Sequence, residues 1–217
     1  MSLLSYSVYT LAYLGLIVWA LRVFTRTRRA GTLFLALVSF GLFYDNLALT
    51  LGGFLPAGDL LHNLSWPRYF FHQLLLPWVI VAAVEQAGLL GAGWASHPTA
   101  KKIFWAATFL LMVYGLTTRV VGLQLEPEVL DGINRYSAAN VSGPPVTSIL
   151  SITGTGLVGI WLWRCARWPW HTLTALLVIV GQAIPNEAIR QLSGSGIEVL
   201  YMVVLILLDQ RQLSKTD

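Results

Sequence analysis

Long apolar stretches recur along the chain and are separated by short polar segments. They run over about 3–23, 31–54, 69–94, 103–125, 146–163, 170–189 and 197–208. An α-helix needs roughly 20 apolar residues to cross a hydrocarbon core about 30 Å thick, and most of these stretches are near that length. Because they are apolar on every face and not along one stripe, they are typical of segments surrounded by lipid. The pattern predicts seven transmembrane helices, of which the last is the shortest.

Helices are the spanning elements that fit these stretches. Backbone amides in lipid must be satisfied within a helix or by closure into a barrel. Barrel strands would give alternating segments of about 10 residues, half the length seen here. We therefore expect an all-α integral membrane protein with one seven-helix domain over residues 1–217. The longest connection, 126–145, is expected to be an external loop with room for a short helix at the interface.

The composition agrees with a membrane location. The chain is 56% hydrophobic and only 11% charged, whereas soluble domains carry about 25% charged residues. The net charge of +4 requires no nucleic-acid partner, so the partner we expect is the lipid bilayer. The single cysteine, Cys165, excludes a disulfide framework and a multi-cysteine metal site.

Basic residues predict the orientation, because they collect in cytoplasmic loops. If the N-terminus lies outside, the inner segments contain most of the basic residues: Arg22, Arg26, Arg28, Arg29, Lys101, Lys102, Arg164, Arg167, Arg211 and Lys215. All four inner segments agree in sign. We expect the C-terminus in the cytoplasm and a multi-pass location in the cell membrane, of the bacterial inner-membrane type.

A charged side chain at the centre of a membrane helix raises the free energy of insertion by about 2.5–3.5 kcal/mol. Polar and ionisable residues within the apolar stretches therefore need partners. In the predicted orientation they gather in the outer halves of five helices: Tyr44, Asp45, Asn46, Arg68, His72, Gln73, Arg119, Gln182, Asn186, Glu187, Arg190, Glu198 and Tyr201. The 4-residue spacing of Gln182, Asn186 and Arg190 predicts one stripe on the sixth helix. Pro77 and Pro185 should kink helices nearby. These features predict an outward-facing polar pocket that binds a substrate.

His72 is the histidine expected inside the membrane, and Asp45 is expected to orient it as a catalytic acid/base. Two alternatives stand beside this interpretation. In one, the acidic residues only form structural ion pairs with Arg68, Arg119 and Arg190. In the other, Asp45, His72 and Glu198 bind a hard or borderline divalent metal ion.

Two functions fit these features. The first is an intramembrane enzyme that acts on a lipid, an isoprenoid or another hydrophobic small molecule. The second is a non-enzymatic binding protein, carrier, sensor or accessory subunit of a larger membrane complex. The inner halves of the predicted helices are nearly free of polar residues apart from Glu85, which favours a one-sided site over a transport path. The pattern specifies neither a cofactor nor a protein partner.

Overall fold

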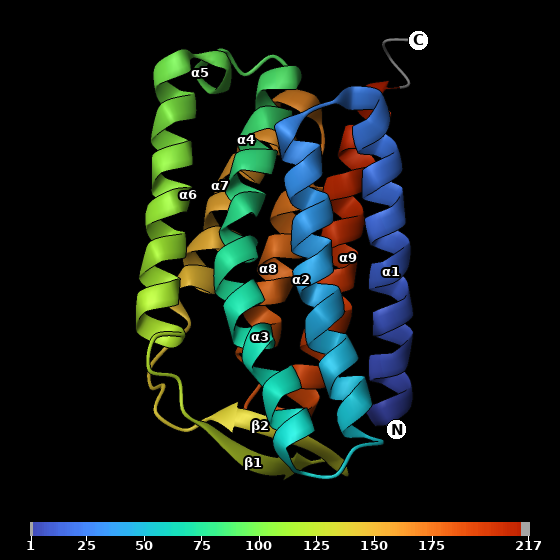
Figure 1. Cartoon of the computed structure of the whole chain (residues 1–217). Coiled ribbons are helices and arrows are strands. Elements are labelled where there is room, and N and C mark those ends of the chain that lie inside the picture. Colours follow the sequence, from blue (N-terminus) through green and yellow to red (C-terminus); the bar gives the residue numbers. More distant parts are fainter. Residues whose placement is uncertain (1, 214–217) are drawn as a thin grey trace.

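The chain forms a bundle of roughly antiparallel helices with a β-hairpin at one end (Figure 1). The computed structural model describes residues 2–213. Its elements, in order, are α1 (Ser2–Thr27), α2 (Ala30–Gly52), α3 (Asp59–Leu75), the 3-10 helix η1 (Leu76–Trp78), α4 (Val79–Leu89), α5 (Gly93–Ser96), α6 (Pro98–Arg119), β1 (Leu125–Leu130), β2 (Ile133–Ala138), α7 (Val146–Ala166), α8 (Trp170–Gln182) and α9 (Glu187–Leu213).

Five helical segments are long and apolar enough to cross a membrane: α1, α2, the continuous run 59–89 that contains α3 and α4, α7 and α9. The helix α8 is apolar but has only 13 residues, and α6 has 22. The protein is therefore mostly helical and has the segments of a membrane protein, as the apolar pattern predicted.

The boundary between the last two helices corrects the sequence prediction. The helix α8 ends at Gln182, and α9 begins at Glu187, ten residues before the predicted start. Asn186 caps α9, because its Oδ1 accepts a hydrogen bond of 3.1 Å from the backbone N–H of Ile189. Pro185 precedes this cap and so lies between helices; it does not kink one.

The third predicted helix also begins earlier, at Asp59, whose carboxylate lies in the first turn of α3. Pro77 interrupts the helix as expected, and the 3-10 turn η1 separates α3 from α4 there. The helix α6 likewise starts before its predicted position, because Pro98 occupies its first turn and His97 accepts a hydrogen bond from the N–H of Thr99.

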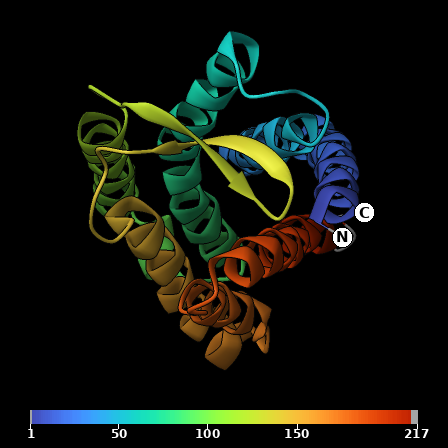
Figure 2. The same ribbon diagram turned by 90° about the horizontal axis from the view of Figure 1, so that it is seen from below.

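The segment expected to be an external loop with room for a short helix contains the hairpin of β1 and β2 in place of that helix. Its turn is Asp131–Gly132, with φ of 51° and 77°. Two consecutive residues with positive φ are typical of a type I′ turn, for which Asp-Gly is a preferred sequence. Seen from its own end of the molecule, the hairpin crosses the middle of the bundle (Figure 2). It is fastened there by Asn134, whose Nδ2 donates to the carbonyl of Leu55 at 3.0 Å.

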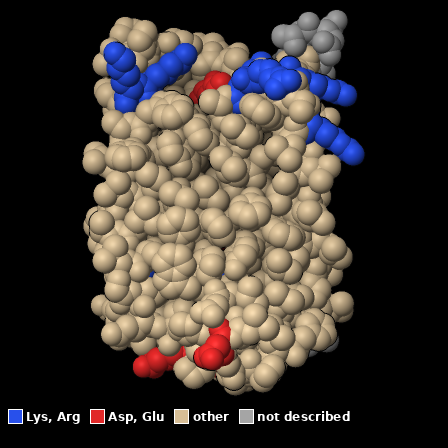
Figure 3. Space-filling model, viewed as in Figure 1, with Lys and Arg blue, Asp and Glu red and all other residues tan. Residues whose placement is uncertain are grey.

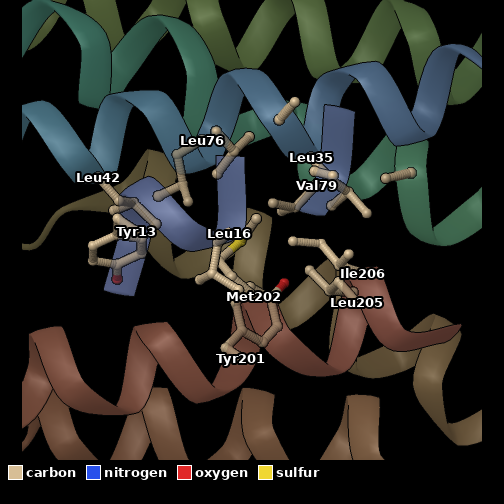
Figure 4. Close-up of a cluster of buried hydrophobic side chains, with 14 of the residues drawn as sticks. Tyr13, Leu16, Leu35, Leu42, Leu76, Val79, Tyr201, Met202, Leu205 and Ile206 are labelled. Carbon is tan, nitrogen blue, oxygen red and sulfur yellow. The ribbon is translucent and has the colours of Figure 1, made fainter. Parts of the chain in front are cut away.

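The centre of the bundle is apolar. Tyr13 from α1, Leu35 from α2, and Tyr201, Met202 and Leu205 from α9 are each at most 1% exposed. Their side chains converge between the helices (Figure 4). This packing fixes α1, α2 and α9 around one core.

Charged side chains are separated along the bundle axis. On the face drawn in Figure 3, the basic groups gather at one end, where one acidic patch lies between them; other acidic groups lie at the opposite end, and a broad, almost uncharged band separates the two ends. The connections α1–α2, α5–α6 and α7–α8 lie at the basic end (Figure 1), which we call the cationic end. The opposite end carries β1 and β2, and we call it the hairpin end. Lys215, counted with the basic residues above, lies outside the described residues.

Candidate functional site

An ion pair joins α2 to α3 toward the hairpin end. Arg68 Nε donates a hydrogen bond of 2.7 Å to Asp45 Oδ1, and the two side chains are only 13% and 28% exposed. Next to Asp45, the Tyr44 hydroxyl donates to the carbonyl of Leu64, also on α3, at 3.1 Å. These contacts fix the register of the two helices at the position where the sequence predicted a site.

His72 lies one turn beyond Arg68 on α3, but its hydrogen bond runs to α7. Its Nε2 is 3.0 Å from Ser148 Oγ. His72 and Asp45 were expected to pair, but each bonds to another residue. His72 bonds to Ser148, and Asp45 bonds to Arg68. Sequence reasoning missed Ser148, since a serine in the first turn of a helix ordinarily indicates no more than local capping.

Gln73 adds a buried acceptor beside this pair. Its side-chain Oε1 is enclosed and has no hydrogen-bond partner. Gly115 of α6 makes the close approach possible, because a Cβ at that position would lie 2.5 Å from Gln73 Oε1 and 2.8 Å from Thr147 Oγ1. The helices α3, α6 and α7 thus meet around His72 and Gln73. We refer to Asp45, Arg68, His72, Gln73 and Ser148 as the outer cluster.

A second set of charged side chains joins the hairpin to the start of α9. Arg135 of β2 is buried, and its guanidinium forms ion pairs with Glu128 at 2.7 Å and with Glu187 at 2.9 Å. Glu187 therefore pairs with a residue that sequence reasoning did not select. Arg119 and Arg190 donate instead to backbone carbonyls, at Gly143 and at Ile184 respectively. Of the pairs allowed by the one-for-one balance of acids and arginines, the described residues form Asp45 with Arg68, whereas Glu187 pairs with Arg135.

The remaining predicted site residues are spread more widely. Gln182 is exposed at the end of α8, so it shares no stripe with the capping residue Asn186 or with Arg190 on α9. Asn46 is buried on α2 and donates to the carbonyl of Leu42 at 2.9 Å. Glu198 is half-buried on α9, one turn from the fully enclosed Tyr201. Their part in substrate binding stays a prediction.

A metal ion is the third possibility raised by the sequence. Within residues 2–213, no three histidine, cysteine, aspartate or glutamate side chains are grouped closely enough to hold one. The alternative set of Asp45, His72 and Glu198 is no exception.

The half of the bundle near the cationic end contains a chain of buried polar groups that sequence reasoning missed. His171 Nε2 lies 2.7 Å from Gln86 Oε1, and Gln86 Nε2 donates to Asp209 Oδ1 at 2.8 Å. Trp168 Nε1 donates to His171 Nδ1 at 3.0 Å, and Thr32 Oγ1 donates to Asp209 Oδ2 at 2.6 Å. We call these five residues the buried chain. It links α2, α4, α8 and α9.

The expectation that this half is nearly free of polar groups was therefore wrong, and His171 lies inside the bundle and not at its surface. His171 is in the first turn of α8, on its buried face, and bonds there to Trp168 and Gln86. A weak signal was present, because Gln86 lies next to Glu85 within the apolar run 69–94, and Asp209 directly follows the run 197–208.

A cavity of about 140 Å³ opens at the same end of the molecule. It lies between α2, α4, α5 and α6 and is lined by Ala30, Val81, Val84, Glu85, Ala95, Lys101, Phe104 and Trp105. The outer cluster lies toward the other end of the bundle.

No known family model matches this chain, and no curated protein is recognisably similar to it.

Proposed function

We propose that the protein crosses the cell membrane seven times, by α1, α2, α3–α4, α6, α7, α8 and α9, with its N-terminus outside and its C-terminus in the cytoplasm. The gathering of basic side chains at one end of the bundle supports this orientation, because positive residues are retained on the cytoplasmic side. A bacterial inner membrane suits this topology. The hairpin end then faces outward.

In this orientation the outer cluster binds the polar group of a lipid, an isoprenoid or another hydrophobic small molecule whose tail lies among the helices. The observation that carries the proposal is the partly buried Asp45–Arg68 pair one turn from His72. Arg68 uses Nε for Asp45, and within the described residues its two Nη nitrogens make no hydrogen bond. These nitrogens form a fork that suits a phosphate or carboxylate group of the ligand.

The chemistry assigned to this site is proton transfer by His72. A general base works within about 2.6–3.2 Å of the proton that it removes, and Ser148 Oγ lies within that range of His72 Nε2. Ser148 either supplies the hydroxyl nucleophile or marks the position that a substrate hydroxyl takes. Asp45 acts indirectly, by holding Arg68 in place for the anionic group.

One observation favours the non-enzymatic alternative. Catalytic histidines are commonly oriented by a carboxylate, and the carboxylate of Asp45 is occupied by Arg68. His72 and Ser148 would then only position a bound molecule. The protein would act as a carrier, a sensor or an accessory subunit.

The two functions are separated by one experiment. The protein is purified in mild detergent, and native mass spectrometry identifies any retained small molecule before and after incubation with total membrane lipid. We expect a retained hydrophobic compound in the wild type and a new product mass that is lost in both His72→Ala and Ser148→Ala. His62→Ala is the matched control, because His62 is exposed on the same helix.

Retention without conversion would support the binding protein instead of the enzyme. Failure of the wild type to retain any hydrophobic compound, or unchanged retention in Arg68→Gln/Asp45→Asn, would overturn the outer cluster as a ligand site. The double variant removes both charges together, so that neither is left unpaired in the bundle.

A further inference from the structure

The cavity at the cationic end is a site of a different kind from the outer cluster. Two of its lining residues carry opposite charges, Glu85 on α4 and Lys101 in the first turn of α6. The other lining residues are apolar or aromatic. A ligand of this cavity therefore meets one anionic group, one cationic group and an apolar wall.

The two charged side chains do not neutralise each other. Among the described residues, neither Glu85 nor Lys101 takes part in an ion pair, although both face the same cavity. Glu85 Oε2 accepts the backbone N–H of Gly31, and its other oxygen has no partner in residues 2–213. A half-buried carboxylate with a free oxygen can still accept a hydrogen bond from a cationic donor.

Aromatic rings form the apolar wall beside these charges. The Trp105 ring lies edge-on to the rings of Phe34 and Trp78, with distances between ring centroids of 5.4 Å and 5.3 Å. The Phe34 and Trp78 rings stack on each other, with their centroids 4.3 Å apart. Trp105 is still 43% exposed toward the outside of the bundle. The cavity thus continues onto a lipid-facing aromatic surface that can hold an acyl chain.

We propose that this cavity binds the headgroup of a zwitterionic phospholipid of the ethanolamine class. The primary ammonium donates hydrogen bonds to the free oxygen of Glu85, the phosphate contacts Lys101, and one acyl chain lies against Trp105. Charge complementarity argues for this occupant: an anionic lipid would be repelled by Glu85, and a choline headgroup has no N–H to donate. The volume of about 140 Å³ corresponds to roughly five waters of 30 Å³ each, which is enough for a small aminoethyl group.

The proposal is tested by lipid competition. Purified protein is mixed with equal amounts of phosphatidylethanolamine, phosphatidylcholine and phosphatidylglycerol with identical acyl chains, and native mass spectrometry counts the retained lipids. We expect the wild type to prefer phosphatidylethanolamine over phosphatidylcholine by about tenfold, since hydrogen bonds to a charged group contribute about that much. Thermal unfolding of each variant shows whether it is folded.

The two charged residues should give different results. Glu85→Gln retains an acceptor for Gly31 but loses the charge, so the preference for phosphatidylethanolamine over phosphatidylcholine should disappear. Lys101→Gln should weaken retention of both lipids without changing their ratio, because both have the same phosphate. Lys102→Gln is the matched control for Lys101, since Lys102 is exposed beside it but does not line the cavity.

Several outcomes would overturn the proposal. An unchanged lipid ratio in Glu85→Gln would remove the carboxylate from recognition, and a wild-type preference for phosphatidylglycerol would show a site for anionic lipids. Equal effects of Lys101→Gln and Lys102→Gln would show only general surface attraction. If Glu85→Gln fails to fold, Trp105→Ala provides the second test, because loss of the acyl contact should lower retention of all three lipids.

Discussion

Gln86 and Asp209 lie 123 residues apart in the chain, and the Gln86 amide donates a 2.8 Å hydrogen bond to the Asp209 carboxylate inside the bundle. Both side chains are almost fully enclosed, at 1% and 2% exposed. The second carboxylate oxygen accepts the hydroxyl of Thr32. Asp209 therefore joins α2, α4 and α9 at one depth. A buried polar contact of this kind can specify which helices are neighbours and in which register they pack.

Replacement of Asp209 by alanine should destabilise the protein. It would leave the Thr32 hydroxyl without its acceptor in the interior, at a cost of about 1–3 kcal/mol. The Gln86 amide would lose one of its two acceptors and keep the carbonyl of Leu205. Asp209→Asn keeps an acceptor oxygen for Gln86, so its midpoint of thermal unfolding in detergent should lie between those of wild type and Asp209→Ala. Equal midpoints for all three proteins would show that the buried chain contributes nothing to stability.

The hydrogen-bond directions in the buried chain determine the protonation of His171. Trp168 can only donate, so Nδ1 of His171 must be the acceptor. Nε2 then has the proton and donates to Gln86 Oε1. We expect the neutral Nε2–H tautomer, which ¹⁵N NMR of labelled histidine would identify by an unprotonated Nδ1. A protonated Nδ1 would mean that Trp168 does not bond to it.

The apolar runs predicted the five helical segments that are long and apolar enough to cross a membrane, because a helix satisfies the backbone of a long hydrophobic stretch within itself. Helix starts were predicted less well. Asn186 caps α9, and Glu187 is an acid in its first turn, which together are typical of a helix start. The apolar residues around them instead favoured one continuous stretch over 170–189. The hairpin turn at Asp131–Gly132 was likewise readable from sequence but was overlooked, because the segment was short of apolar residues.

Partner choice was harder to predict than location. The sequence offered several arginines as partners for each acid, and only packing decides that Asp45 pairs with Arg68. Arg135 takes Glu187 because β2 brings it over the start of α9. Long-range contacts of this kind depend on how the hairpin folds back, which no local pattern encodes.

Arg135 should hold the hairpin on the bundle. Its buried guanidinium bonds to Glu128 on the neighbouring strand and to Glu187 on α9. Arg135→Ala should speed hydrogen exchange of residues 125–138 by about tenfold, equivalent to roughly 1.4 kcal/mol for contacts that are partly open to water. Arg119→Ala is the control, since Arg119 bonds only to loop carbonyls. Equal exchange in both variants would place the anchor elsewhere.

Two glycines within helices should respond in opposite ways to the same added methyl group. At Gly115 a Cβ would lie 2.5 Å from Gln73 Oε1, whereas at Gly15 of α1 no atom lies within 4 Å. Gly115→Ala should therefore lower the free energy of unfolding by about 1–3 kcal/mol, because α3 and α6 must separate. Gly15→Ala should be neutral or stabilising by up to about 1 kcal/mol, since alanine favours helix. Unfolding in detergent compares the two, and a neutral Gly115→Ala would mean that Gln73 moves away freely.

Cys165 offers a direct measurement of orientation. It is exposed in the last turn of α7, between Arg164 and Arg167 at the cationic end. If that end lies in the cytoplasm, a membrane-impermeant maleimide should label Cys165 only after cells are permeabilised. The matched control is Asn63→Cys in a Cys165→Ser background, because Asn63 is exposed near the hairpin end and should react in intact cells. Labelling of Cys165 in intact cells, with Asn63→Cys protected, would reverse the orientation and place the outer cluster in the cytoplasmic leaflet.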